Sequence, residues 1–294
     1  MLPGVSAQHS TKPRIAIVGA GNLASALAVA LHQAGYAVDQ VISRESASAR
    51  RKAGRLAGKV GALASAVGKT EIRVDIVWFC VPDAAIASAA ASLALAGQWS
   101  GKIALHSSGA LTSDELAILR KRGAAVASVH PLMTFVQGSR PPLAEVPFAI
   151  EGDRRATLQA GKIVKNLGGR AFAIRKQDKA AYHAWGTFAS PLLTALLATT
   201  EQVSASSGVK GKTARLRMLP ILRQTLANYA NFGAPGAFSG PIVRGDVDTV
   251  KRHLRALRPA PIAQQVYISL ARAALAYLPT KNKAALEKAL KSLR

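Results

Sequence analysis

Short apolar runs alternate with longer amphipathic stretches over the first 175 residues. The apolar, β-branched runs are 14–18, 37–43, 74–81, 101–107, 123–130, 146–152 and 170–174. Runs that are apolar on both faces are typical of strands buried between helices in a parallel sheet. Because stretches such as "SASARRKAGRLA" and "DAAIASAAASLALA" between them have helical periodicity, the pattern predicts a doubly wound α/β domain.

Strand signals stop after residue 176, and the rest of the chain has a helical pattern. We expect helices over 178–208, 213–233, 247–257, 261–278 and 282–293. Pro191 should kink or split the first of them, because proline removes a helical hydrogen bond. The predicted organisation is a leader (1–12), a Rossmann nucleotide-binding domain (13–175) and an all-α domain (176–294).

The charge balance is strongly basic, with 39 Lys and Arg against 15 Asp and Glu in 294 residues. The excess is spread over both halves, which favours anionic ligands, although a merely solvated basic surface is an equal alternative. No run approaches the roughly 20 apolar residues of a membrane span. Since the first residues lack a signal-peptide pattern and Cys80 is the single cysteine, we expect a cytoplasmic protein.

A glycine loop, "GAGNLASAL", joins the first predicted strand to the first helix. In this context a G-x-G-x-x-A pattern indicates dinucleotide binding. Gly19 permits the tight turn, Gly21 lets the backbone approach a pyrophosphate, and Ala24 allows close packing of helix on strand. The predicted cofactor contacts of this loop are Gly19, Gly21, Asn22, Leu23 and Ala24. A glycine turn that binds nothing is the alternative.

The end of the second predicted strand selects between the two nicotinamide cofactors. An NAD site carries an acidic residue there, which accepts from the ribose 2′-hydroxyl, but this chain has Ser43 and Arg44. A hydroxyl beside a guanidinium suits a 2′-phosphate, and Arg50, Arg51 and Lys52 follow closely. The sequence therefore predicts NADP, unless Arg44 is simply a solvated loop residue.

Further strand ends carry residues that we expect to border the ribose and nicotinamide, because ligands of such sheets bind at the carboxyl ends of the strands. These residues are Val81, Pro82, His106, Ser107 and Ser108. His130 ends the next strand. A lone histidine at a strand end is more often a hydrogen-bonded core residue, but two at adjacent ends favour a polar site.

Several motifs together resemble one bacterial family. "GAGNLASAL", "VPDAAI", "HSSGAL", "HPLMTF", "FAIEGD", "KAAYHAW" and "GPIVRGD" have the order and spacing of proteins that join a Rossmann-like NADP-oxidoreductase domain to a helical DUF2520 domain. The resemblance runs from about Pro13 to about Leu278. The family looks related to coenzyme-F420-dependent NADP oxidoreductases, pyrroline-5-carboxylate reductases and the 6-phosphogluconate-dehydrogenase-like group.

The resemblance implies a nucleotide site and a helical domain that builds a homodimer. The family's own substrate is not established, while its relatives reduce C=N or C=O bonds or pass hydride to a deazaflavin. This chain departs from the family at Pro191, which stands where relatives have an asparagine. A polar side chain at such a place can line the active site of related enzymes, so catalysis or the substrate could be altered. Ser239 is a milder change.

The helical half supplies candidates for the proton donor that reduction of a carbonyl or imine requires. Lys179 and His183 are spaced i, i+4 and share a helix face, with Tyr182 close by. We expect His183 as general acid, His130 as its orienting partner and Lys179 as the second candidate, against the alternative of packed or solvated helix residues. Asp246 is expected to cap the helix that follows it, and Arg244 could bind a substrate carboxylate.

The leading hypothesis is an NADP(H)-dependent oxidoreductase that acts on a small, anionic substrate at the domain junction. A non-catalytic NADP-binding sensor or scaffold is the alternative, which Pro191 favours. Nucleic-acid binding through the basic segments 209–217 and 250–258 is a weaker hypothesis, because only 5% of the residues are aromatic and no recognised motif is present. No metal site is expected.

Overall fold

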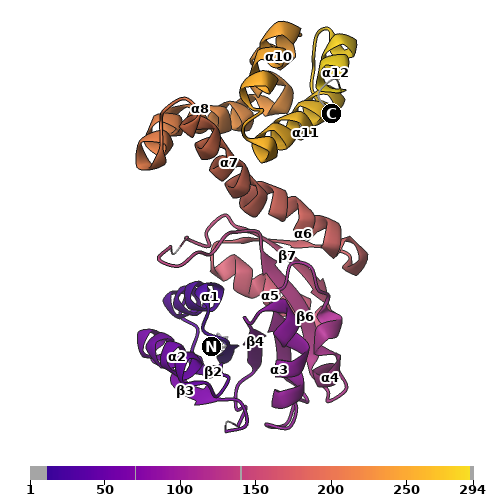
Figure 1. Cartoon of the computed structure of the whole chain (residues 1–294). Helices are drawn as coiled ribbons and strands as arrows, with labels where there is room; N and C mark the ends of the chain where they lie inside the picture. Colours follow the sequence, from indigo (N-terminus) through magenta and orange to yellow (C-terminus); the bar gives the residue numbers. More distant parts are fainter. Residues whose placement is uncertain (1–11, 70, 140, 292–294) are drawn as a thin grey trace, which may run out of the picture. The chain divides into compact units, whose positions relative to one another are not determined.

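The computed structural model describes residues 12–69, 71–139 and 141–291, and these form two compact units. The first unit extends to Phe188 and the second begins at Ala189 (Figure 1). The sequence placed the boundary earlier, after residue 175. Apart from Lys12, the predicted leader lies outside the described residues.

The first unit is built on an eight-stranded sheet in the order β3-β2-β1-β4-β5-β6-β7-β8. The strands are β1 (Ile15–Val18), β2 (Val38–Ser43), β3 (Leu63–Ala66), β4 (Ile76–Phe79), β5 (Ile103–His106), β6 (Ala125–Pro131), β7 (Pro147–Gly152) and β8 (Arg170–Ala173). All seven predicted strands form. The prediction missed β3, a short edge strand that begins with the exposed Leu63.

The sheet is mostly but not wholly parallel, because β7 runs antiparallel to β6 while every other described pair is parallel. The predicted doubly wound α/β domain is confirmed, and the antiparallel step from β6 to β7 is a feature that the sequence did not predict. Along the described part of the connection from β6 to β7 there is no helix. A crossover between parallel strands usually contains a helix, so a connection without one agrees with the antiparallel return of β7.

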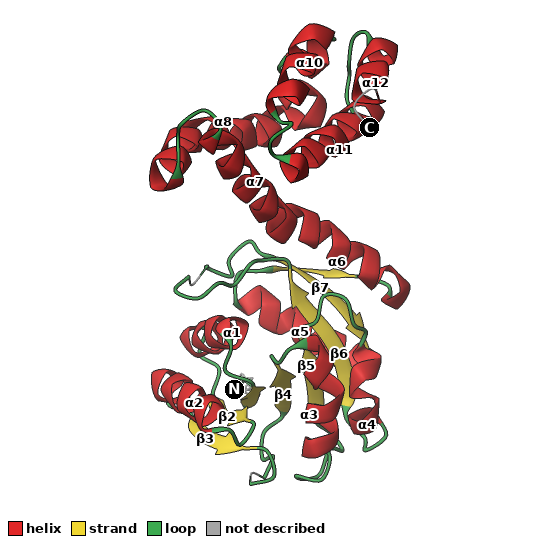
Figure 2. Cartoon of the chain, in the orientation of Figure 1, coloured by secondary structure: helices red, strands yellow, loops and turns green. Residues whose placement is uncertain are grey.

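Helices cover both faces of the sheet (Figure 2). α1 (Asn22–Gln33), α2 (Ala47–Val60) and α5 (Arg154–Asn166) pack on one face, and α3 (Ile86–Leu93) and α4 (Ala117–Arg120) on the other. Alternate strand residues enter the two cores: Trp78 packs with the first set of helices, and Val77 and Phe79 with the second. This alternation explains why the strands are apolar on both sides.

The helix predicted over 178–208 is distorted at Pro191: α6 (Lys179–Thr187) continues through a π-helical turn (Phe188–Leu192) into α7 (Leu193–Ala205). The second unit continues with α8 (Gly211–Ala237), α9 (Pro241–Arg244), α10 (Val247–Ala256), α11 (Pro261–Tyr277) and α12 (Lys283–Lys291). α9 was not predicted. The expected cap of α10 is confirmed, since Asp246 Oδ1 accepts from the Thr249 amide at 3.0 Å.

No described helix is both long enough and apolar enough to cross a membrane.

Candidate active site

The glycine loop between β1 and α1 has the backbone geometry that anion binding requires. Gly19 has φ of 110°, and a Cβ there would lie 2.4 Å from the Cys80 carbonyl oxygen, so only glycine fits beside β4. A Cβ on Gly21 would meet no described atom within 4 Å, so space is open before its backbone. Among the described side chains none caps α1. The backbone amides at the start of α1 are therefore free to bind a pyrophosphate.

The remaining residues of the loop have different tasks. Ala24 is fully buried in the core under α1, which is the packing role predicted for it. Asn22 donates its side-chain amide to the Phe135 carbonyl oxygen at 3.2 Å, and Leu23 is half-buried. Asn22 thus ties the segment after β6 to the start of α1.

At the end of β2, the positively charged side chain that was predicted to bind a 2′-phosphate is accessible. Arg44 is exposed and makes no ion pair within the described part of the chain. Ser43 is buried, and its hydroxyl donates to the Arg44 carbonyl oxygen at 3.1 Å. Ser46, which sequence reasoning missed, caps α2 by accepting from the Ala49 amide. The guanidinium of Arg44, more than the hydroxyl of Ser43, is the group available to a phosphate.

The two serines after β5 are largely occupied in shaping a turn. Trp78 Nε1 donates to Ser107 Oγ at 2.9 Å, while Ser108 Oγ donates to Asp83 at 2.8 Å. Ser108 Oγ also accepts from the Leu111 amide at 2.9 Å. The predicted residues at the end of β4 lie close by: Val81 is half-buried and Pro82 is exposed.

His106 does not present a nitrogen to a cofactor, contrary to the expectation from sequence. The ring is fully buried, and burial lowers its pKa to about 4, so it is neutral at pH 7. Its Nδ1 accepts from the Ser108 amide at 3.1 Å, so its Nε2 carries the proton and donates to the Thr112 carbonyl oxygen at 2.9 Å. His106 instead holds the turn between β5 and the 3-10 helix η2 (Ser113–Leu116).

This turn places Gly109 next to His130 and His183, the two histidines that the sequence predicted to work together. A Cβ on Gly109 would lie 2.6 Å from His183 Cδ2 and 2.8 Å from His130 Nε2, so the position has room only for glycine. The two imidazoles stand almost perpendicular, with ring centroids 6.0 Å apart. His183 is exposed, whereas His130 is half-buried and its Nδ1 lies 2.9 Å from the Tyr182 hydroxyl. Gly109 was quoted within a motif but not recognised as a site residue.

Lys179, the second candidate for proton donor, is fully buried and already engaged. Its ammonium donates to Ser128 Oγ at 2.7 Å and to the Ser108 carbonyl oxygen at 3.0 Å. Burial lowers its pKa to about 8, against the opposing charges of Glu151 and Asp83. The side chain therefore anchors α6 to the β5 turn and to β6. This anchoring explains why the compact unit extends as far as Phe188.

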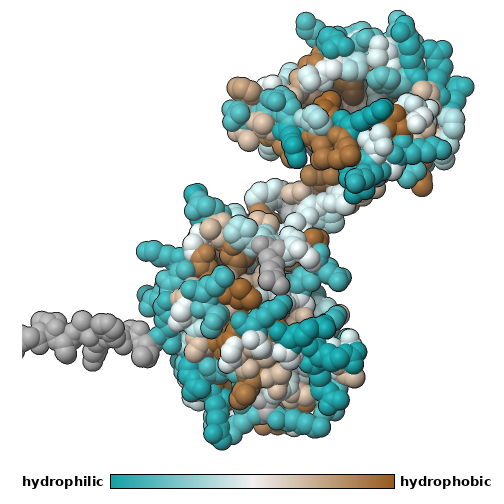
Figure 3. All heavy atoms as spheres, turned by 90° about the vertical axis from the view of Figure 1, so that its left-hand side faces the viewer, coloured by the Kyte–Doolittle hydropathy of each residue, from teal (hydrophilic) through white to brown (hydrophobic). Residues whose placement is uncertain are grey.

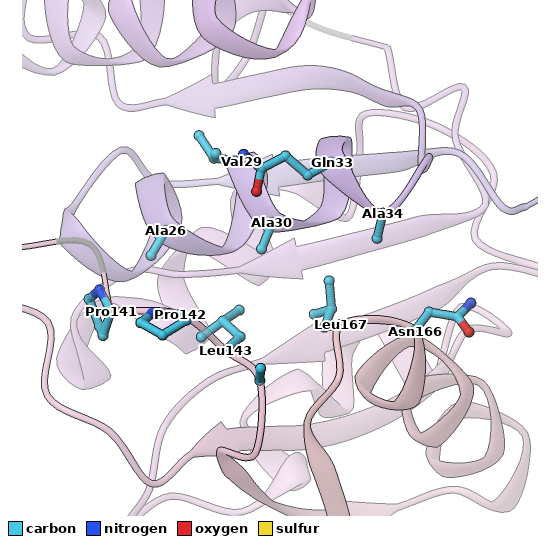
Figure 4. A pocket seen from close by; sticks show the side chains of 11 residues that line it. Ala26, Val29, Ala30, Gln33, Ala34, Pro141, Pro142, Leu143, Asn166 and Leu167 are labelled. Carbon is cyan, nitrogen blue, oxygen red and sulfur yellow. The ribbon is translucent and has the colours of Figure 1, made fainter.

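A separate hollow of about 570 Å³ lies between α1, residues 141–144 and the end of α5 (Figure 4). Its lining is apolar apart from Gln33 and Asn166, and none of the predicted site residues contributes to it. The carboxyl ends of the strands, where the histidines lie, remain the better candidate site.

Comparisons with known proteins agree with this architecture. Residues 3–131 match a Rossmann-like domain, and residues 146–274 match a domain of unknown function, DUF2520. The resemblance inferred from the motifs and the predicted fold are thereby confirmed. No curated protein matches the chain.

Three solved structures illustrate the likeness. A Bacteroides fragilis protein provisionally named an NADP oxidoreductase is 22% identical over 90% of this chain and 98% of its own, with a TM-score of 0.74. A Thermotoga maritima protein is 23% identical over 93% and 98%, with a TM-score of 0.67. A reductive aminase from Aspergillus terreus, in complex with NADPH and ethyl-5-oxohexanoate, is 17% identical over 95% and 99%, with a TM-score of 0.63. These identities support a shared fold.

Proposed function

We propose that this chain, in which a Rossmann-like domain precedes a DUF2520 domain, is an NADP(H)-dependent oxidoreductase. It would transfer hydride between nicotinamide and a small substrate with a C=O or C=N bond, or a deazaflavin. The observation that carries the proposal is the meeting of His130 and His183 at Gly109, beside the carboxyl ends of β5 and β6. The NADPH complex of the reductive aminase with the same fold supports the choice of cofactor.

The residues present fit an NADP molecule. The α1 amides near Gly21 would hold the pyrophosphate, and Arg44 would bind the 2′-phosphate. The bound nicotinamide supplies or accepts the hydride. A strongly basic chain, with net charge +24, raises the encounter rate of anionic cofactors and substrates.

The two histidines would divide the remaining chemistry. Burial lowers the pKa of His130 to about 4, so this ring is neutral at pH 7 and is a poor source of a proton. His183 is exposed on α6 beside Gly109 and is the better proton donor to the reduced substrate. Lys179 would act by holding the turn that carries Gly109, since its ammonium already binds Ser108 and Ser128.

Replacing Arg44 with alanine tests the cofactor. We expect NADPH affinity to fall about 10- to 100-fold, because a charge-assisted bond contributes roughly 1.5–3 kcal/mol, while NADH affinity should not change. Calorimetric titration with each nucleotide at about 150 mM and about 500 mM salt measures both affinities.

Arg122→Ala is the matched control for this test. It removes the same charge from an exposed residue that precedes β6, at the amino ends of the parallel strands, whereas Arg44 follows the carboxyl end of β2. Equal losses in the two variants would show that the overall field, and not a 2′-phosphate site, binds NADPH. NADPH binding without turnover of any carbonyl, imine or deazaflavin substrate would favour the non-catalytic sensor.

We further propose that the second unit forms a homodimer. Within the described chain, no residue of α7 is buried and α8 buries only Ala214. Large apolar side chains of α8 are exposed instead: Leu216, Ile221, Leu226, Tyr229 and Phe232. Figure 3 shows hydrophobic residues, in brown, on the visible face of this helical unit. Apolar surface of this kind is typical of a protein interface, and a second copy would cover it.

Leu226→Arg is expected to convert the dimer to a monomer, because an arginine would be buried without a partner in the interface. Sedimentation velocity at micromolar concentration measures the change. Leu158→Arg is the matched control, since Leu158 is an equally exposed leucine of α5 in the first unit. A monomeric wild-type protein would contradict the proposal.

A further inference from the structure

Within the first unit, the buried Tyr182 forms a hydrogen bond with the half-buried His130. Tyr182 is 7% exposed, and its hydroxyl lies 2.9 Å from His130 Nδ1. The rings meet edge to face, with centroids 5.5 Å apart. No other partner of this hydroxyl is present among the residues that the structure describes. The Tyr182 hydroxyl and His130 Nδ1 therefore have to serve as donor and acceptor for each other.

Hydrogen-bond accounting selects one tautomer of His130. A neutral imidazole has one N–H donor and one bare nitrogen acceptor. If Nδ1 carried the proton, it would donate to the phenol oxygen, and the phenol proton would remain buried without an acceptor. An orphaned donor of this kind is strongly unfavourable, because it has lost its bonds to water. If Tyr182 donates to a bare Nδ1, both groups are satisfied and the proton of His130 sits on Nε2.

The choice of tautomer assumes that Tyr182 and His130 are both neutral, and both are neutral at pH 7. Burial raises the pKa of Tyr182 to about 12 and lowers that of His130 to about 4. After burial, the nearby Lys179 ammonium is the next cause that disfavours a positive charge on His130. A phenolate and an imidazolium are thus both excluded near neutral pH.

The Nε2 atom of His130 lies on the side of the ring that faces Gly109. The point at which a Gly109 Cβ would stand is 2.8 Å from this nitrogen and 2.6 Å from His183. A proton on His130 Nε2 therefore lies beside Gly109, close to His183, the proposed proton donor. Because residue 109 is glycine, no side chain at this position separates the His130 N–H from the ring of His183.

We propose that Tyr182 is a positioning residue that fixes His130 as its Nε2–H tautomer, and that this N–H selects a carbonyl oxygen over a protonated imine. The inference rests on the proposed function. A carbonyl oxygen has lone pairs to accept the bond, whereas a protonated imine nitrogen has none. In the reaction, hydride adds to the carbonyl carbon, the π electron pair moves to oxygen, and oxygen takes a proton from His183. The products are an alcohol and NADP⁺.

Nitrogen-15 NMR of the histidine rings in the full chain tests the tautomer without any turnover. We expect His130 to show an unprotonated Nδ1 and a protonated Nε2, and His130→Gln identifies its signals by their loss. In Tyr182→Phe, the Nδ1 resonance should move toward that of a mixture of tautomers. His106 is an internal reference, because its own bonds to Ser108 and Thr112 require the same tautomer in every variant.

Tyr267→Phe is the matched control, because it removes a hydroxyl 3.1 Å from His253 Nδ1 in the second unit. It should leave the His130 signals unchanged. A proton on Nδ1 of wild-type His130 would overturn the inference, even if Tyr182→Phe fails to fold.

Substrate preference tests the second half of the inference. With a carbonyl substrate, Tyr182→Phe should lower kcat/KM about tenfold, which corresponds to one hydrogen bond of about 1.4 kcal/mol, without changing NADPH affinity. Faster reduction of protonated imines than of carbonyls by the wild-type protein would contradict the selection. Absence of NADPH binding would refute the proposed function but would leave the NMR result readable.

Discussion

Replacing His183 with glutamine is expected to lower kcat/KM for the proposed reduction by about 10²–10⁴-fold, the usual contribution of a general acid. Glutamine keeps a polar N–H group but cannot release a proton. His183 is the exposed imidazole at Gly109, whereas the half-buried His130 has its Nδ1 engaged with Tyr182. Steady-state kinetics over a range of pH, together with calorimetric titration of NADPH, separate loss of chemistry from loss of cofactor.

The matched control is His253→Gln, which changes an exposed histidine of α10 in the second unit. It should leave both kcat/KM and NADPH affinity within about twofold, as expected for a surface substitution. If His183→Gln keeps nearly full activity, the proton must come from elsewhere. A drop in NADPH affinity that equals the loss of kcat/KM would assign His183 to cofactor binding instead.

The wild-type protein is expected to gain up to about 3 kcal/mol of unfolding free energy relative to Lys179→Met as pH rises from 7 to 10.5. The pKa of Lys179 is about 8 in the folded protein against an ordinary value of 10.5. Between these values the unfolded chain binds more protons, so the stability of the wild type increases by about 1.4 kcal/mol for each rise of one in pH. Below pH 8 the folded protein bears the full cost of burying the ammonium.

Urea denaturation of both proteins at several pH values measures this difference, and the subtraction cancels the titration of other groups. Lys176→Met is the control, because Lys176 lies near the start of α6 but is exposed and pairs with Asp114 at 2.5 Å. A difference between wild type and Lys179→Met that stays constant from pH 7 to 10.5 would show that the folded protein does not perturb Lys179.

Much of the fold followed from local pattern. Ile15–Val18, Val38–Ser43 and the later buried strands were predictable because each is a nearly continuous apolar run between helices. The direction of β7 was not, because the local sequence of a strand does not record its pairing. The direction of β7 depends on the length and structure of the connection from β6.

The sequence indicated candidate site residues, but it did not indicate their contacts. Strand-end position singled out His106 and His130 and treated them alike. Their neighbours separate them, since His106 is enclosed by the Ser108 and Thr112 backbone while His130 lies against Tyr182 and Gly109. Lys179 was identified by helix periodicity, which could not reveal that Ser128 lies opposite its ammonium.

Local sequence was enough to specify the glycine loop, the helix distortion at Pro191 and the cap at Asp246, because each depends on backbone conformation or bonding among neighbouring residues. Tertiary packing was needed to show that His183 is exposed and that the Lys179 ammonium is buried and bonded to Ser108 and Ser128. The bond between His130 and Tyr182 joins positions 52 residues apart, and that between Lys179 and Ser108 joins positions 71 apart. Contacts over such separations exist only after the sheet has assembled and α6 has packed against it.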